Sequence, residues 1–183
     1  MKKSRKRRMR IRYVLLIVLL MIFLFISGCP LNSNKTQSFY LAGEIIVQSV
    51  IPVNVIISFY SSDCVIYYNF DGTVTDMANF SSVGQIQKTD VVSQNTFQIL
   101  IPEPYGSIGG VLAWIDKDNN ETPDPLTEEV VLLKRSIEGV ISVITGVEYD
   151  PTVNNFLISY ENKSGSFQQY LSIIGNDNYS FNF

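Results

Sequence analysis

Oxygen-bearing side chains recur at every second position in one stretch of the 183-residue chain, Ala113 to Glu129, which reads AWIDKDNNETPDPLTEE. Counted from Asp116, this spacing follows the template of a calcium loop, in which alternate positions supply side-chain or backbone oxygens to the ion. The candidate metal ligands are Asp116, Asp118, Asn120, Thr122 (through its carbonyl), Asp124 and Glu128. Two positions depart from the template: Glu121 replaces the turn glycine, and Glu128 stands one residue after the place of the bidentate glutamate.

The same loop has a second interpretation, a polar turn between two strands. Asp and Asn side chains in turns commonly accept hydrogen bonds from their own backbone, and Pro123 and Pro125 stiffen the second half of this loop. If the loop binds calcium, an extracellular type of site with a dissociation constant of roughly 10⁻⁴ to 10⁻³ M is expected. The sequence leaves both interpretations open.

Catalytic chemistry has little support in the sequence. The chain contains no histidine, which excludes Ser-His-Asp and Cys-His centres, histidine-bearing zinc sites and histidine pH switches. Paired carboxylates can hydrolyse glycosides, and the candidates are Asp116, Asp118, Asp124, Glu128 and Glu129. No pattern places two of them across a cleft. A non-enzymatic binding or structural module is therefore expected. The alternatives are a calcium-stabilised adhesion or assembly component and a surface glycan-processing enzyme that uses the loop carboxylates.

Aromatic residues form the other candidate binding chemistry, because flat rings pack on the C–H groups of sugars. The candidates are Tyr67, Tyr68, Tyr105, Trp114 and Tyr170. Trp114 stands among apolar neighbours, which favours a core position over an exposed stacking platform. Cys64 precedes the apolar run VIYY and is expected to be a small buried hydrophobe, with a reactive thiol as the alternative.

The N-terminal residues predict export. Eight of the fourteen Lys and Arg residues lie within residues 1–12, and residues 13–26 form an uninterrupted apolar run. A basic segment before such a run is typical of a secretory signal, and this run is shorter than the roughly 20 residues that span a bilayer. The run ends at Ile26-Ser27-Gly28-Cys29, which resembles the lipobox of bacterial lipoproteins.

The lipobox resemblance implies a signal peptide over residues 1–28 and acylation of Cys29, which becomes the new N-terminus. The chain would then be held at a membrane of the bacterial cell envelope, outside the cytoplasm. Each buried methylene contributes about 0.8 kcal/mol, and stable anchoring takes about two acyl chains, which a diacylglyceryl cysteine supplies at one residue. An uncleaved short anchor with an incidental cysteine is the alternative.

The charge of the processed chain limits its partners. Residues 29–183 carry six Lys and Arg residues against seventeen Asp and Glu residues, a net charge of −11. Such a domain repels a phosphate backbone, so nucleic-acid binding is not expected. Anionic lipid headgroups repel this domain for the same reason, so the acyl chains on Cys29 would have to hold the protein at the membrane. A protein or glycan partner remains open.

Alternating apolar and polar residues predict strands that would position the acidic loop. After a polar tether over residues 29–38, strands are expected at 41–48, 53–60, 64–70, 84–92, 96–101, 110–115, 130–134, 140–147, 156–160, 167–174 and 178–183, with turns such as Asp71-Gly72 between them. We predict one all-β domain over residues 39–183, arranged as a single β-sandwich. The alternating Tyr179, Phe181 and Phe183 look like the last strand of an outer-membrane barrel, but a final strand of the sandwich is favoured.

Three segments resemble a known kind of module. Leu41-Ala42-Gly43-Glu44-Ile45, Phe97 to Pro102 and Gly110 to Asp116 occur in the order found in transthyretin-like and carboxypeptidase-regulatory-like β-sandwiches of exported proteins. The resemblance covers residues 39–135 and implies an immunoglobulin-like sandwich without a reaction of its own. Residues 136–183 exceed the module and are expected to add strands to its sheets.

Overall fold

The computed structural model describes residues 38–102, 108–137, 139–171 and 179–183, all within one compact unit that begins at Ser38. Every regular element in these residues is a β-strand, so the prediction of an all-β fold is confirmed. The described part of the chain contains no helix with the length and apolarity needed to cross a membrane. The lipobox with Cys29, residues 30–37 of the predicted tether and Tyr105 lie outside the described residues.

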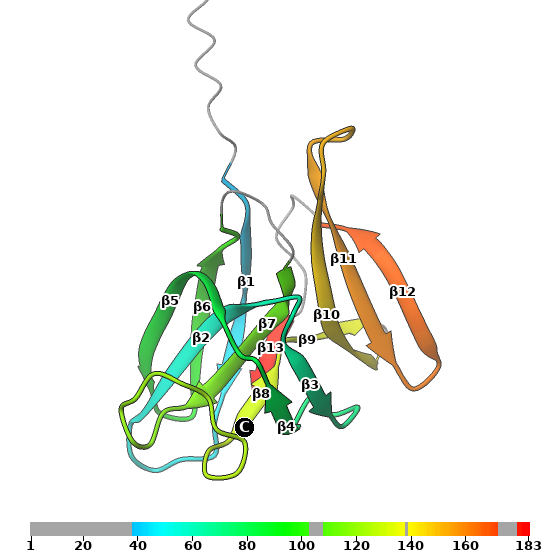
Figure 1. Cartoon of the computed structure of the whole chain (residues 1–183). Coiled ribbons are helices and arrows are strands. Elements are labelled where there is room, and N and C mark those ends of the chain that lie inside the picture. Colours follow the sequence, from blue (N-terminus) through cyan, green and yellow to red (C-terminus); the bar gives the residue numbers. More distant parts are fainter. Residues whose placement is uncertain (1–37, 103–107, 138, 172–178) are drawn as a thin grey trace, which may run out of the picture. The chain divides into compact units, whose positions relative to one another are not determined.

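Thirteen strands form within the described residues (Figure 1). They are β1 (Tyr40–Ile46), β2 (Val53–Ser61), β3 (Val65–Tyr68), β4 (Val74–Ala78), β5 (Ser82–Val91), β6 (Gln94–Leu100), β7 (Ile108–Ile115), β8 (Val130–Leu132), β9 (Lys134–Ile137), β10 (Val140–Asp150), β11 (Asn155–Asn162), β12 (Gly165–Tyr170) and β13 (Tyr179–Asn182). Eleven strands build one sheet, and β3 and β4 pair as a separate hairpin.

The large sheet curves so that its two end strands, β5 and β6, approach each other. Its main path runs β5-β2-β7-β10-β9-β13-β1-β6, with β8 added beside β7 and with β11 and β12 extending from β10. A tight turn joins β5 to β6, and Asn95 of β6 donates a hydrogen bond of 3.2 Å to Oγ1 of Thr89 in β5. The sheet is therefore nearly closed around its inner face.

Strand β2 shows why these residues form strands in this place. Val55, Ile57 and Phe59 belong to the main core, whereas Ile56 and Tyr60 belong to a second core on the opposite face. Residues 55–60 are all buried, so the apolar side chains of this antiparallel strand stand on both of its faces. The β3–β4 hairpin supplies the residues that cover this second core, and Figure 1 shows it beside β8.

In two places the observed strands differ from the predicted ones. The predicted turn at Asp71-Gly72 forms, with Gly72 at φ 91° and Oδ1 of Asp71 accepting a 2.9 Å hydrogen bond from the Thr73 amide, but strand β4 after it was not predicted. The single strand predicted over residues 130–134 divides into β8 and β9 at Leu133. The Leu133 amide donates to Val111 in β7, while its carbonyl accepts from Ile144 in β10. The chain changes partner strand at this residue.

The strands from β9 onward are built into the large sheet. Strand β10 pairs with β7, β9 and β11, and β13 lies between β9 and β1. The pairing of β13 with β1 is parallel and places Tyr179 beside Gly43. Strands from residues 136–183 therefore complete the main core instead of forming an appendage.

Candidate metal centre

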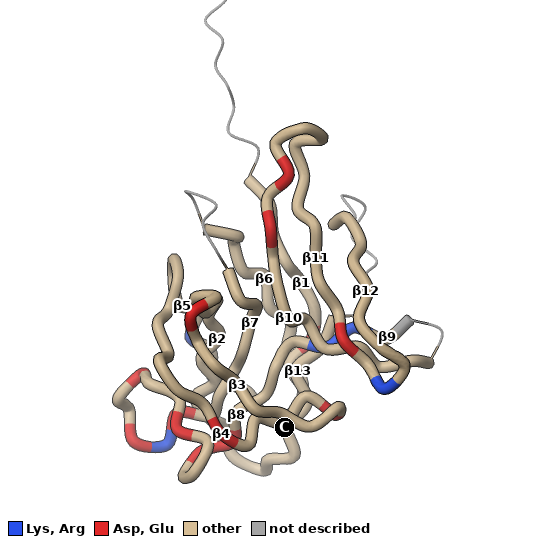
Figure 2. The backbone as a smooth tube through the Cα atoms, turned by 45° about the vertical axis from the view of Figure 1, so that its right-hand side comes forward, with Lys and Arg blue, Asp and Glu red and all other residues tan. Residues whose placement is uncertain are grey.

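The acidic loop joins β7 to β8, and hydrogen bonds pin both of its ends. The Asp116 amide donates to the Asn54 carbonyl at 3.0 Å, and the Ile115 amide donates to the Glu129 carbonyl at 3.0 Å. Figure 2 shows acidic residues gathered at the lower end of the view, around β4 and β8. The loop therefore starts and ends on strands that the cores hold in place.

The loop lies at the far end of the strands from the point where the described chain begins. Strand β1 runs from Tyr40 to Ile46, and the Val47 amide that follows it donates to the Ser93 carbonyl in the β5–β6 turn. Val53 faces Val91 just before this turn, and Val55 faces Ile115, the last residue of β7. The acidic loop and the β5–β6 turn thus share one end, and residue 39 stands at the other.

Three of the six predicted metal ligands come together. One carboxylate oxygen from each of Asp116, Asp118 and Glu128 lies within 4.8 Å of the other two. Asp116 is only 6% exposed and Glu128 only 7%, whereas Asp118 is exposed. Two buried carboxylates and one exposed carboxylate form a group that can hold a metal ion.

The carboxylate of Asp116 is only partly satisfied. Its Oδ2 accepts a long hydrogen bond of 3.3 Å from Nδ2 of Asn54. Its Oδ1 is shielded from solvent and has no hydrogen-bond partner in the part of the chain that the structure describes. An unpaired charged oxygen inside a protein is costly, and a bound cation is one of the groups that can compensate it.

Glu128 is held in place by the backbone of its own loop. Oε1 accepts a 2.8 Å hydrogen bond from the Lys117 amide, and Oε2 accepts a 3.2 Å hydrogen bond from the Asp124 amide. The Thr127 and Glu128 amides both donate to the Asp124 carbonyl, which closes a tight turn. This turn brings Glu128 back to the cluster, although it stands one residue after the template position.

The loop also shows the self-bonding expected of a polar turn. Asp118 accepts from the amide of Asn120 at 3.1 Å and from its Nδ2 at 2.6 Å, and Oδ1 of Asn120 accepts from the Thr122 amide at 2.6 Å. The carboxylate of Asp124 accepts from the Leu126 amide and from Oγ1 of Thr127. Asp124 is outside the group of three carboxylates, because it stabilises this turn instead.

Glu121 adopts the backbone conformation that the calcium template assigns to glycine. Its φ is 60°, and Asn119 has a φ of 59°. The left-handed region is uncommon for residues other than glycine and is tolerated best by Asn and Asp. The missing glycine therefore does not prevent the sharp turn. The side chain of Glu121 points to solvent and forms an ion pair with Lys88.

The chemistry of the donors selects the class of ion. The cluster offers only carboxylate oxygens, which are the ligands of hard cations such as Ca²⁺ and Mg²⁺. Glu129 does not belong to the cluster; its carboxylate lies 3.6 Å from Nζ of Lys117, and both side chains are more than half exposed. Negative charge at the three clustered carboxylates favours cation binding and disfavours an anionic ligand.

The four predicted aromatic residues that the structure describes lie in different environments. Trp114 is fully buried and makes a T-shaped contact with Phe80 at a centroid distance of 5.9 Å, as the core interpretation predicted. The hydroxyl of Tyr68 donates to Glu161, and that of Tyr170 donates to Asp150. Tyr67, on β3, is 60% exposed.

Cys64 packs at the margin of the second core and is half-buried. Burial raises the pKa of its thiol above the usual value, which lowers the fraction of reactive thiolate at neutral pH. This environment agrees with a small hydrophobe.

Sequence reasoning missed Asn54, the residue that contacts the carboxylate of Asp116. Asn54 precedes Asp116 by 62 positions and reaches it because β2 pairs with β7. The alternation of residues 53–60 predicts a strand but does not specify its neighbour.

Comparisons with protein-family models, with curated proteins and with solved structures find no match to this chain.

Proposed function

We propose that this chain is a lipid-anchored, non-enzymatic module of the bacterial cell envelope, in which a calcium ion bound by the β7–β8 loop stabilises a surface for binding or assembly. The observation that carries the calcium site is the buried Oδ1 of Asp116, which has no hydrogen-bond partner among the described residues and belongs to the carboxylate cluster with Asp118 and Glu128. The lipobox pattern at residues 26–29 supports the anchor.

Calcium is preferred to magnesium on coordination grounds. Calcium accepts 6 to 8 oxygens in flexible geometry, whereas magnesium requires a near-ideal octahedron. The three carboxylates come from one irregular loop, and the side chain of Glu128 is fixed by two backbone amides. Water and loop carbonyls would supply the remaining oxygens, which agrees with a weak extracellular site.

The position of the loop suits a surface that is presented to partners. Residue 39 enters the domain at the opposite end of the strands from the loop. If the chain is anchored through Cys29, the loop belongs to the end of the domain that is farther from the attachment point. A calcium ion at that end would order the surface that meets a protein or glycan partner.

The proposal includes the architecture suggested by the resemblance to transthyretin-like and carboxypeptidase-regulatory-like modules. We take the curved sheet as a distorted two-layer sandwich, supported by one continuous core to which β2, β7, β10 and β1 all contribute. In such a domain the strands act as a scaffold and the loops at its ends carry the function.

Thermal unfolding of the purified chain with calcium, magnesium or chelator tests the metal site. A native-state ligand at ten times its dissociation constant adds about 1.4 kcal/mol, which should raise the midpoint by roughly 3–6 °C. The rise should be specific for calcium and absent in Asp118→Asn. The control Asp63→Asn, which removes another exposed carboxylate, should keep it. An unchanged midpoint at about 10 mM calcium, well above the expected dissociation constant, would contradict the proposal.

Detergent phase separation and intact-mass measurement test the anchor. The chain expressed in a bacterium should enter the detergent phase and begin at an acylated Cys29. Cys29→Ser should keep the leader and lose the acyl mass. Recovery of the unchanged chain with Met1 and without lipid would overturn this part of the proposal and leave the calcium site untouched.

A further inference from the structure

Within the described residues, strand β12 is an edge of the large sheet. It pairs with β11 along its whole length, from Gly165 facing Asn162 to Tyr170 facing Leu157. No other strand in the described ranges pairs with its second side, and Figure 1 shows β12 at the right-hand margin of the view. Half of the N–H and C=O groups of such an antiparallel strand point away from its only neighbour.

The sequence of β12 carries none of the usual protections of an edge strand. GSFQQY contains no charged residue and no proline, and its register with β11 has no bulge. Natural sheets commonly block such edges with lysine, proline, bulges or covering segments. In Figure 2 strand β12 carries no residue coloured as charged, and all six of its residues are exposed.

The strands at the ends of the main sheet path differ from β12. Strand β5 contains Lys88 and Asp90, and its pairing with β2 has a register shift. Strand β6 is also neutral, but the hydrogen bond from Asn95 to Thr89 connects it to β5. Neither end of the main path therefore matches the neutral, regularly paired edge of β12.

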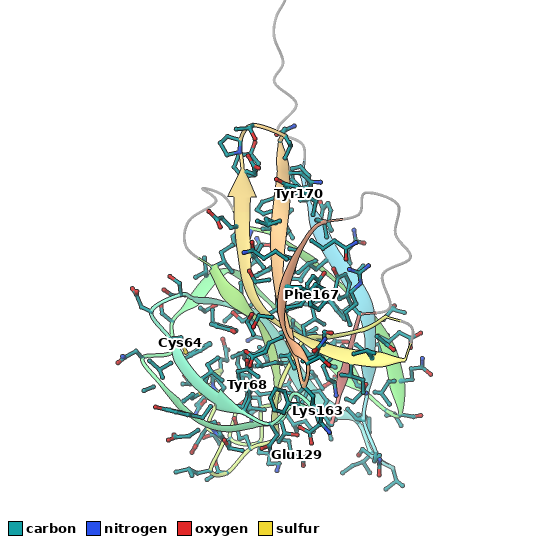
Figure 3. All side chains as sticks on the ribbon, turned by 90° about the vertical axis from the view of Figure 1, so that its right-hand side faces the viewer. Cys64, Tyr68, Glu129, Lys163, Phe167 and Tyr170 are labelled. Carbon is teal, nitrogen blue, oxygen red and sulfur yellow. The ribbon has the colours of Figure 1, made fainter. Side chains whose placement is uncertain are left out.

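Side-chain contacts hold β12 firmly in an extended conformation. The ring of Phe167 stacks on that of Tyr160 at a centroid distance of 5.0 Å and an interplanar angle of 16°. Oε1 of Gln169 accepts a 2.8 Å hydrogen bond from Arg135, and Nε2 of Gln168 donates to Ser159 at 3.1 Å. Figure 3 looks onto this side of the domain and labels Phe167 and Tyr170 along the strand. A strand ordered in advance loses little conformational entropy when another strand pairs with it.

We propose that β12 pairs antiparallel with β12 of a second copy of this chain, so that two sheets join across a two-fold axis. A second copy fits this edge because it offers the same uncharged strand with the same unpaired backbone groups. Although residues 29–183 carry a net charge of −11, no charged side chains face each other where the two β12 strands meet. A two-fold contact uses the same edge on both copies and leaves neither edge open.

The two-fold axis determines which residues meet. If the axis is perpendicular to the joined sheet, the same face of β12 lies on the same side of the sheet in both copies. Even-numbered residues of one copy then face even-numbered residues of the other, and odd-numbered residues face odd-numbered ones. We centre the axis on Gln168, near the middle of β12, so that Gln168 lies opposite its own counterpart and Phe167 lies opposite Gln169 of the second copy. Directly opposed side chains have Cβ atoms about 4.5–5.5 Å apart, where like charges destabilise the pair.

Charge variants at Gln168 test the dimer in the full-length chain, purified in detergent and measured by native mass spectrometry. The unchanged chain should be dimeric, whereas Gln168→Lys and Gln168→Glu should each be monomeric, because like charges face each other at the axis. An equal mixture of the two variants should form a mixed dimer. Gln98→Lys, the same substitution at an exposed position of β6, should leave the dimer intact.

Circular dichroism of each variant confirms that the domain is folded. A monomeric unchanged chain at the highest soluble concentration would overturn the proposal, and so would a dimer that persists in both Gln168 variants. Failure of the mixed variants to associate would show that the contact does not pass through residue 168. None of these outcomes depends on the calcium site or on acylation of Cys29.

Discussion

Tyr68 and Glu161 are separated by 93 positions in the chain, yet the Tyr68 hydroxyl donates a hydrogen bond of 2.7 Å to Oε2 of Glu161. The bond joins the β3–β4 hairpin to β11, and Figure 3 shows Tyr68 on this side of the domain. Burial is the main cause that raises the pKa of the Tyr68 phenol, and the contact with Glu161 raises it further. The hairpin that covers the second core is thereby tied to the sheet extension that carries β12.

Replacing Tyr68 with Phe should loosen this connection. The substitution removes a hydrogen bond to a carboxylate at a half-buried position, so we expect a loss of about 1 kcal/mol in the free energy of unfolding. Urea denaturation measures the loss. Tyr67→Phe is the matched control, because Tyr67 lies on the same strand and is 60% exposed. Equal stability of both variants would show that the Tyr68 bond does not contribute.

Alkaline pH should destabilise the domain through Tyr60. Burial is the main cause that raises the pKa of Tyr60, and repulsion from the Cys64 thiolate and the Tyr68 phenolate adds to it. The folded state therefore keeps a proton that the unfolded chain releases near pH 10, so the stability is present below about pH 10 and is lost as the pH rises further.

The expected slope is about 1.4 kcal/mol per pH unit for one such proton. Urea denaturation between about pH 9 and about pH 11 measures this slope. Tyr60→Phe should reduce the slope by the contribution of about one proton. An unchanged slope in this variant would contradict the assignment to Tyr60.

Trp114 should be one of the most costly residues to remove. It is fully buried in the second core, and Trp114→Ala should lower the free energy of unfolding by about 3–5 kcal/mol. Trp114→Phe should cost less, because its ring still fills part of the site and Nε1 of Trp114 has no hydrogen-bond partner within the described residues. Circular dichroism during denaturation reports both variants, and Leu126→Ala, at a position 86% exposed, serves as the neutral control.

Gly43 should tolerate no side chain. A Cβ at this position would overlap the backbone carbonyl of Tyr179, where β1 runs parallel to β13. Gly43→Ala should therefore displace β13 and destabilise the domain by about 1–3 kcal/mol. Gly146→Ala is the comparison, because its Cβ would lie 3.4 Å from the Ser159 side chain, an ordinary contact. Similar midpoints of thermal unfolding for the two variants would refute this steric argument.

Local patterns allowed much of the fold to be predicted. Residues 53–60 and 156–160 alternate, and both segments form strands near the predicted bounds. The turn at Asp71-Gly72 also formed as predicted. Strand β4 was missed because VTDMA has polar residues at its centre and gains its order from pairing with β3. Alternation reports burial on one face and gives little signal for a short, mostly exposed strand.

The sequence by itself determined the all-β class, the acidic loop and the set of oxygen donors from which a metal site can be built, because alternation, turn residues and donor spacing are local properties. Only the tertiary structure decided that Asp116, Asp118 and Glu128 meet while Asp124 stays in its own turn. It also brought Asn54 to Asp116, inserted β13 between β9 and β1, and left β12 as an edge. These outcomes depend on strand pairing between distant segments, which is set by how both faces of each strand pack and not by any single stretch of residues.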